Sequence, residues 1–407
     1  MTDIAPLTIH ETLSTWLQAD GMPILCDLKK SQGSYLHDVR SGKDYLDMSS
    51  FYGGRPLGFN HPKLLDPTFV LRLEKIALKQ PQHGDVDATE YASFVQTLGT
   101  VALGNDFSQV FVMEGGSLAL EHALKTAIDW KHHNNKKGSH IIAFKEAFHG
   151  STAHVLSHVT NPKKHFPFDE KALAETMALE HVALTEIDEI FNLHPHEVAA
   201  IIIEPIQCAG GDNYFRSEFF QKLRAIANER ECLLIFDEVQ TGFGATGHWW
   251  AWQWLDVKPD IMLFGKKAGV CGFAASQRLD EAGSTFSNVA DMVRCERVMQ
   301  IVLEEKLLDN ATTMGRYLQK LLLELSHTRS DVSNVRGIGV LAAFDMTTTA
   351  VRDQLLKACF EQELIVLPCG LKSICMRPTL DVNADAVGRA VAQLEAALRQ
   401  TTTKRCS

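Results

Sequence analysis

The sequence predicts an α/β fold in which a large domain with a mostly parallel sheet lies between two pieces of a smaller α+β domain. In the middle of the 407-residue chain, short strands that are apolar throughout alternate with amphipathic helices, which is typical of parallel strands covered on both faces. On both flanks, a polar hairpin and long helices replace that alternation. We therefore expect residues 1–48 and 294–407 to form the small domain and residues 49–293 the large one.

The first elements follow from local patterns. Residues 33–48 are rich in polar side chains and predict a hairpin, and the apolar stretch QVFVMEGG at 109–116 predicts a buried strand that stops at two glycines. The helix after it places Leu120, Leu124 and Ile128 on one face, four residues apart.

Further apolar strands are predicted at 140–150, 198–207, 232–240 and 260–267, with a short partner strand at 271–276. Beyond residue 294, long helical patterns enclose the short strands IGVLAAFDM and ELIVLP. The predicted sheet of the large domain therefore draws its strands from the middle of the chain.

Composition argues against several classes of function. The net charge is −10 and the pI is about 5.9, so a nucleic-acid-binding face is not expected. The nine cysteines include no Cys-x-x-Cys pair, which favours reduced thiols in a cytoplasmic protein and no metal site. Cys369 and Cys375 are either a redox pair or two packing residues, and packing is favoured. The sequence contains no signal peptide or membrane-spanning run, so no membrane partner is expected.

Polar or aromatic residues follow the carboxyl end of each main predicted strand. They are Glu114-Gly115-Gly116-Ser117, Phe148-His149-Gly150, Glu204, Asp237 with Gln240, and Lys266 with Lys267. Ligands of parallel α/β sheets bind at these ends, so the five ends indicate one binding site. Gly116 and Ser117 begin a helix, where free backbone amides suit a phosphate, although a tight turn is the simpler explanation for a lone GGS.

Asp237 ends a wholly apolar strand, where an uncompensated carboxylate is costly. It either caps a loop, pairs with an arginine, or faces a cationic heteroaromatic nitrogen. Lys266 ends the next apolar strand, and a partly desolvated lysine can form an imine with a carbonyl. A phosphate site, a carboxylate, a lysine and a flat ring such as Phe148 together describe a site for pyridoxal phosphate.

These residues lie in stretches that resemble the class III aminotransferases of fold type I, and within them the L-lysine 6-aminotransferases. The matching stretches include FVMEGGSLALEHALKTAIDW, EAFHG, EPIQ, LLIFDEVQTGFGATGHWWAWQWLDVKPDIMLFGKKAGVCG, DMVR and MRPTL, from about Ser31 to Leu380. FGKKAGVCG, and Ala245 where most of the class has arginine, suggest the lysine-type subgroup. The resemblance implies pyridoxal 5'-phosphate as cofactor and a mostly parallel, seven-stranded sheet in the large domain.

The resemblance also implies roles for individual residues. Lys266 would be the Schiff-base lysine, since it lies six residues after Asp260, and Lys267 would be a structural or surface charge. Asp237 would pair with the pyridinium nitrogen of the cofactor. The other expected cofactor contacts are Gly116 and Ser117 at the phosphate, Phe148 and Val239 on opposite ring faces, Gln240 at the ring hydroxyl, Glu204, and Thr285 at the neighbouring subunit's phosphate. A site shared in this way implies a homodimer.

Substrate residues are the part of the pattern in which this chain departs from the family. Arg377 matches the arginine that binds the substrate carboxylate. Ser151 stands where lysine-type enzymes carry an arginine for the distant carboxylate of lysine, and Ala209 replaces a glutamate that masks the second arginine. Without that glutamate, Arg377 is expected to stay unmasked. Arg55 either replaces part of the missing arginine's role or is a surface residue.

The resemblance implies an ω-aminotransferase that moves a terminal amino group from a lysine-like or other amine to 2-oxoglutarate or another 2-oxo acid. Lys266 would act as base and then as acid in the proton transfer. A decarboxylase, isomerase or racemase on the same scaffold is the alternative, and a non-catalytic dimer of this fold is a third possibility.

Overall fold

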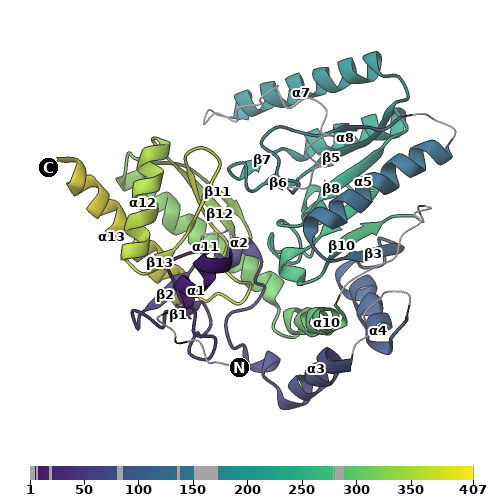
Figure 1. The fold of residues 1–407 in the computed structure, drawn as a ribbon. Helices are drawn as coiled ribbons and strands as arrows, with labels where there is room; N and C mark the ends of the chain where they lie inside the picture. The colour runs from purple at the N-terminus through teal and green to yellow at the C-terminus, as the bar shows by residue number, and fades with distance from the viewer. Residues whose placement is uncertain are drawn as a thin grey trace.

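The computed structural model describes residues 5, 8–17, 21–79, 86–134, 138–150, 173–277, 279 and 288–406, without the side chains of 173–179 and 402–406. Figure 1 shows two parts, with the large sheet and its helices on the right and the C-terminal helices in a smaller part on the left. None of the described helices is both long and apolar enough to cross a membrane.

The large part is built on a sheet with the strand order β3-β10-β9-β8-β5-β4. These strands are β3 (Gln109–Met113), β4 (His140–Ile142), β5 (Val198–Ile203), β8 (Leu233–Asp237), β9 (Ile261–Phe264) and β10 (Cys271–Ala275). Neighbours among β4, β5, β8 and β9 pair in parallel, and β10 runs antiparallel to both β9 and β3. The mostly parallel α/β fold is therefore confirmed, with six strands in the described residues where seven were expected.

Side chains of the central strands alternate between two cores. Ile203 and Phe236 belong to a cluster that includes side chains of α7 (Leu173–Leu193) and α8 (Ser217–Glu229). Ile202 and Ile235 belong to another cluster with α5 (Gly116–His133). Because helices cover both faces of the sheet, every position of β5 and β8 is apolar except Asp237 at the end of β8, which explains the pattern in the sequence.

The remaining elements of the large part surround this sheet. They are η2 (Pro62–Leu64), α3 (Pro67–Lys79), α4 (Thr89–Thr97), η3 (Leu98–Ala102), the hairpin of β6 (Ile206–Gln207) and β7 (Asn213–Tyr214), α9 (Ala251–Leu255), η4 (Lys266–Ala268) and α10 (Val289–Glu304). The helix α10 packs against α3 and α4, so the expected boundary between residues 293 and 294 falls inside one continuous helix. The domain boundaries stay predictions.

The small part joins the two ends of the chain. The expected hairpin at 33–48 is confirmed as β1 (Tyr35–His37) paired antiparallel with β2 (Asp44–Asp47), and β13 (Leu364–Ile365) adds to β2 in parallel. A second sheet has the order β11-β12-β15-β14. Its strands and the helices of this part are β11 (Val332–Ile338), β12 (Leu341–Met346), β14 (Leu367–Cys369), β15 (Ser373–Met376), α1 (Ile9–Trp16), α11 (Leu307–Thr328), α12 (Thr349–Glu361) and α13 (Ala384–Cys406).

The cysteines agree with the favoured interpretation of the sequence. All eight whose side chains the structure describes are free thiols. Cys369 and Cys375 lie buried in a small cluster with Ala343 and Leu367. They therefore pack side by side in the core of the small part.

Candidate active site

The carboxyl ends of the parallel strands meet at one edge of the sheet, as the sequence predicted. The registers place Ile203 beside Phe236 and Asp237 beside Leu263, so β5, β8 and β9 end at the same level. β3 and β4 are the outermost strands of the same sheet. The residues that follow these five strands are therefore held together by the fold.

Val239, two residues after β8, packs against two of the turns at these strand ends. A Cβ atom added to Gly116 would lie 3.4 Å from Val239 Cγ1, and one added to Gly265 would lie 3.2 Å from the same atom. The turn that begins α5 and the turn that carries Lys266 thus meet on one side chain. Glycine at both positions keeps this contact close.

The amino end of α5 has the features of an anion site. Gly115 precedes the helix with φ of 101°, a conformation that favours glycine, and no side chain caps the first amides. Gly150 packs so closely on this end that an added Cβ would lie 2.3 Å from Ser117 Oγ. Gly116 and Ser117 therefore lie where free amides can receive a phosphate, next to the Phe148–Gly150 turn.

Glu204 holds the turn that presents Phe148. Its Oε1 accepts a hydrogen bond from the backbone N–H of Phe148 at 2.8 Å. Burial raises the pKa of Glu204 to about 8, with His149 opposing and Asp237 supporting the shift. Phe148 is 59% exposed, so its side chain is accessible to a ligand. In this structure Glu204 therefore positions Phe148 by accepting a hydrogen bond from its backbone.

Asp237 is compensated by a histidine that the sequence had given no role. Its Oδ2 lies 2.8 Å from His149 Nδ1, with both side chains buried, and its Oδ1 accepts the N–H of Val239 at 3.1 Å. Burial disfavours a charged imidazole, but the hydrogen bond and charge of Asp237 outweigh burial and raise the pKa of His149. In the sequence, a role for His149 is indicated by its position after a predicted strand and directly before Gly150.

The two adjacent lysines have different surroundings. Lys266 is half-buried with φ of 47°, a left-handed conformation that is strained for a residue with a side chain. Burial lowers the pKa of Lys266, although Cys208 and Asp237 oppose the shift, and a lowered pKa favours the neutral amine that a nucleophile requires. Lys267 is buried, and its Nζ donates to the carbonyl of Gly53 at 2.8 Å. Lys267 is therefore structural, and the surface alternative is wrong.

Gly53 belongs to a left-handed turn, α2 (Ser50–Gly53), beside the lysines. Ser50, Phe51 and Tyr52 all have positive φ. Gln240 Nε2 donates to the carbonyl of Tyr52 at 3.0 Å. Gln240 and Lys267 thus fasten this strained turn to the ends of β8 and β9.

Arg377 corrects an expectation from the sequence. It was expected to be unmasked because Ala209 replaces the family's glutamate, but its Nη2 forms an ion pair with Oδ1 of Asp212, and both side chains are 0% exposed. Its Nη1 also donates to the carbonyl of Met376 at 2.9 Å. A carboxylate three residues further along the chain therefore masks the arginine.

The loop around Asp212 is clamped from the small part. Arg336 Nε donates to the carbonyl of Asp212 at 3.0 Å, and its Nη2 donates to the carbonyl of Gly211. The N–H of Gly370 donates to the carbonyl of Ala209 at 2.9 Å. Asp212 Oδ2 and Arg377 Nε are nevertheless buried without a hydrogen-bond partner among the described residues, so the pair uses only part of its bonding capacity.

Arg55 lies against its own loop. Its Nε donates to the carbonyl of Leu57 at 2.9 Å, its Nη2 to that of Gly58 at 3.3 Å, and its guanidinium carbon lies 3.8 Å from the centre of the Phe59 ring. Burial lowers its pKa, against the charge of Asp381. Arg55 is thus half-buried rather than a free surface residue, and its substrate role stays a prediction. Ser151 and Thr285 lie outside the described residues.

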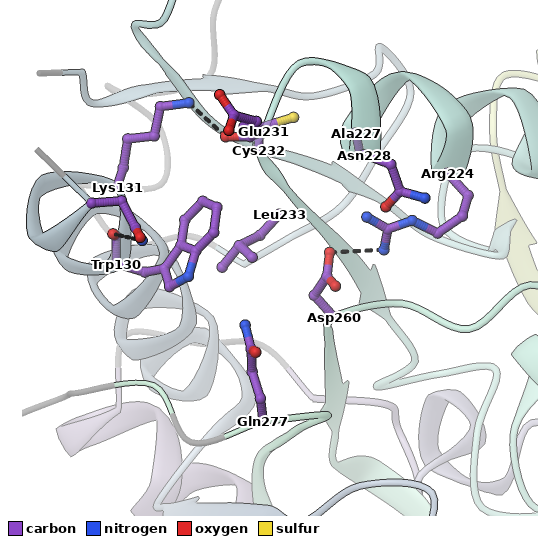
Figure 2. A pocket seen from close by; sticks show the side chains of 11 residues that line it. Trp130, Lys131, Arg224, Ala227, Asn228, Glu231, Cys232, Leu233, Asp260 and Gln277 are labelled. Carbon is purple, nitrogen blue, oxygen red and sulfur yellow. Dashed lines mark hydrogen bonds and ion pairs between the residues drawn. The ribbon is translucent and has the colours of Figure 1, made fainter. Parts of the chain in front are cut away.

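A separate cavity lies at the other end of the sheet, where β8 and β9 begin. It has a volume of about 340 Å³, and Trp130, Lys131, Arg224, Asp260 and Gln277 line it, among other residues (Figure 2). Arg224 Nη1 lies 2.8 Å from Asp260 Oδ2, and Lys131 Nζ donates to the carbonyl of Glu231 at 2.7 Å. Because the cavity lies away from the carboxyl ends of the parallel strands, it is not part of the candidate active site.

The residues at the carboxyl ends fit pyridoxal phosphate by their chemistry. The uncapped start of α5 suits its phosphate, and the buried carboxylate of Asp237 suits a protonated ring nitrogen. Lys266 provides an amine with a lowered pKa. Phe148 and Val239 are the expected covers of the two ring faces, and the described contact of Gln240 is with the Tyr52 carbonyl.

Comparisons with known proteins agree with this fit. The family model described as Aminotransferase class-III matches residues 17–398. The L-lysine-epsilon aminotransferase of Mycobacterium tuberculosis is 39% identical, with 97% of this chain and 96% of that protein covered. The enzyme of the same name from Streptomyces clavuligerus is 33% identical, over 95% and 93% of the two chains. A solved structure of lysine aminotransferase from M. tuberculosis matches with a TM-score of 0.92 at 37% identity, over 98% of this chain and 100% of that one.

Proposed function

The chain belongs to the class III aminotransferases, and we propose that it moves the terminal amino group of a lysine-like amine to 2-oxoglutarate or a related 2-oxo acid. It is a pyridoxal-phosphate-dependent enzyme, as members of this family are. The observation that carries the proposal is Lys266, an amine with a lowered pKa held at the same sheet edge as the buried Asp237. The names of the relatives support the lysine-like donor.

Different residues of the chain would hold the cofactor and transfer the proton. Bound pyridoxal phosphate supplies an electron sink next to the carbon that loses its proton. Asp237, hydrogen-bonded to His149, would face the ring nitrogen, and Gly116 and Ser117 would hold the phosphate. Lys266 removes the proton from the amine-bearing carbon of the donor, and in the second half-reaction it delivers a proton to the carbonyl carbon of the acceptor.

Arg377 is our candidate for the carboxylate of the 2-oxo acid. An entering carboxylate must first replace Asp212, since both members of that pair are 0% exposed. The unpartnered Nε of Arg377 and Oδ2 of Asp212 support such an exchange, because each has bonding capacity to spare. Arg55 is our candidate for a second carboxylate on the amine donor, in a chain where Ser151 replaces the family's arginine.

We further propose that the enzyme works as a homodimer in the cytoplasm. Phe51, Tyr52 and Phe148 are 53%, 61% and 59% exposed, and a second copy of the chain, with its Thr285 at the neighbouring phosphate, would cover such aromatic surface at the site. The free thiols fit a reducing compartment.

The test is a panel of amine donors incubated with 2-oxoglutarate and scored by glutamate formation. Wild type should form glutamate from lysine or another terminal amine, and Lys266→Ala should form none, whereas release of CO₂ or a racemised product without glutamate would indicate the alternative chemistries. Arg55→Ala should lower kcat/KM only for donors with a distal carboxylate. Unchanged kcat/KM across the panel would remove Arg55 from the site and leave the transamination itself standing.

A further inference from the structure

Two histidines and a glutamate gather at the end of the sheet where β4 and β5 begin. His140 is the first residue of β4, Glu197 precedes β5, and His194 follows α7. One donor atom from each lies within 4.8 Å of the others, and all three residues are half-buried. We propose that these side chains form a binding site for a Zn²⁺ ion, which prefers imidazole and carboxylate ligands.

The distances suit that ion. His194 Nδ1 lies 3.1 Å from Glu197 Oε2, and His140 Nδ1 lies 3.6 Å from the same oxygen. Donor atoms bound at about 2.05 Å around a tetrahedral zinc ion lie about 3.3 Å apart. The two observed distances lie on either side of that separation, and the two imidazole donors lie within 4.8 Å of each other, so side-chain rotations can bring all three donors onto one metal ion.

The backbone holds the three residues in place without a metal ion. The N–H of His140 donates to the carbonyl of Glu197 at 3.1 Å, and the N–H of Glu197 donates to the carbonyl of His194 at 3.2 Å. Gly138 packs so tightly here that an added Cβ would lie 2.2 Å from the Glu197 carbonyl oxygen. The donors therefore come from a hydrogen-bonded junction of strand, turn and helix end, which lowers the cost of ordering them around a ligand.

The hydrogen bonds of the cluster are incomplete. His140 Nδ1 is buried without a hydrogen-bond partner among the described residues. The two imidazoles stack with their centres 4.5 Å apart, an arrangement in which two imidazolium charges would repel. One divalent ion satisfies both ring nitrogens and the carboxylate together. Three protein ligands leave a fourth position for water.

The ion would fasten α7 to the edge of the sheet and take no part in transamination. β4 and β5 begin at this cluster and end at the candidate active site, so the two sites lie at opposite ends of the same strands. A metal ion that binds the folded chain stabilises it. We therefore expect zinc to raise the melting temperature and to leave kcat unchanged.

The test uses tag-free enzyme with its cofactor, treated with a chelator, dialysed, and titrated with Zn²⁺ by calorimetry. We expect one equivalent per chain with micromolar or tighter affinity, and Co²⁺ in its place should give a visible spectrum free of thiolate charge-transfer bands. His140→Gln and His194→Gln should each weaken binding at least about 10-fold, as loss of a metal ligand does. Glu197→Gln serves the same purpose where a histidine variant fails to fold.

The matched control is His196→Asn, because His196 is an exposed neighbour in the same turn with φ of 68°, which asparagine tolerates. It should bind zinc as wild type does. The proposal is overturned by the absence of a stoichiometric zinc site, by unchanged affinity in the ligand variants, or by an equal loss of affinity in His196→Asn.

Discussion

Asp212→Asn tests whether the carboxylate that masks Arg377 is also the group that a substrate displaces. Asparagine keeps the shape of the side chain and one oxygen acceptor, and it removes the negative charge. We expect two opposite effects, a less stable protein and a lower KM for 2-oxoglutarate, because Arg377 would then be free of a competing carboxylate.

The magnitudes follow from the burial of the pair. Both side chains are 0% exposed, and at an effective dielectric constant of about 20 two unit charges about 4 Å apart attract by about 4 kcal/mol. Breaking a buried pair by removing one partner costs about 3–5 kcal/mol, and the retained oxygen places the loss of unfolding free energy at the lower end of that range. If the substrate carboxylate no longer has to displace Asp212 and thereby gains about 1.4 kcal/mol of binding free energy, KM falls about 10-fold.

The assay is steady-state glutamate formation with varied 2-oxoglutarate, together with thermal unfolding of the same samples. The matched control is Glu296→Gln, which removes a buried carboxylate that pairs with Arg72 at 3.2 Å and that, in the described part of the chain, forms no hydrogen bond or ion pair with Arg377 or with the loop around Asp212. It should lower stability without lowering KM. If Asp212→Asn loses stability while KM stays unchanged or rises, the pair is permanent and the substrate carboxylate binds elsewhere.

Two further predictions concern buried charges beside the site. Burial lowers the pKa of Lys267 to about 7 from an ordinary value of 10.5. Between about pH 7 and 10.5 the unfolded chain therefore binds more protons than the folded chain, so the free energy of unfolding rises with pH. The unfolding free energy of wild type relative to Lys267→Met, measured in urea, should therefore increase across that pH window by up to about 5 kcal/mol. If this difference does not change with pH, burial does not lower the pKa of Lys267. His149→Ala should lower the unfolding free energy by about 3–5 kcal/mol in chemical denaturation, because it leaves Asp237 buried without its partner. A loss below about 1 kcal/mol would mean that water replaces the imidazole as the partner of Asp237.

The sequence predicted the sheet and most of the candidate site for one physical reason. A strand covered on both faces must be apolar along its length, and the first polar residue after it marks the carboxyl end, where ligands of parallel sheets bind. Glu204, Asp237 and Lys266 could each be placed at such an end from local pattern alone. In the structure, the strands that these residues follow or end lie in one sheet and finish at the same level.

The partners of those residues could not be predicted in the same way. His149 was visible beside a strand end, but its pairing with Asp237 across 88 positions depends on how β4 and β8 align on either side of β5. Lys267 carries no sequence signal of burial, because its contact is the Gly53 carbonyl, 214 positions away. The cluster of His140, His194 and Glu197 has no metal-binding spacing, since its donors meet only where β4 lies beside β5.

The sequence by itself determined the fold class and the cofactor, because these depend on periodicity and on motifs that are continuous along the chain. Only the tertiary structure decided that Arg377 is masked. The charge that was expected to be missing at Ala209 is supplied by Asp212, which reaches an arginine 165 positions away through a loop clamped by the small part. Charge compensation in a buried site depends on distances of a few ångströms between side chains, and those distances are set by the packing of the two parts of the molecule.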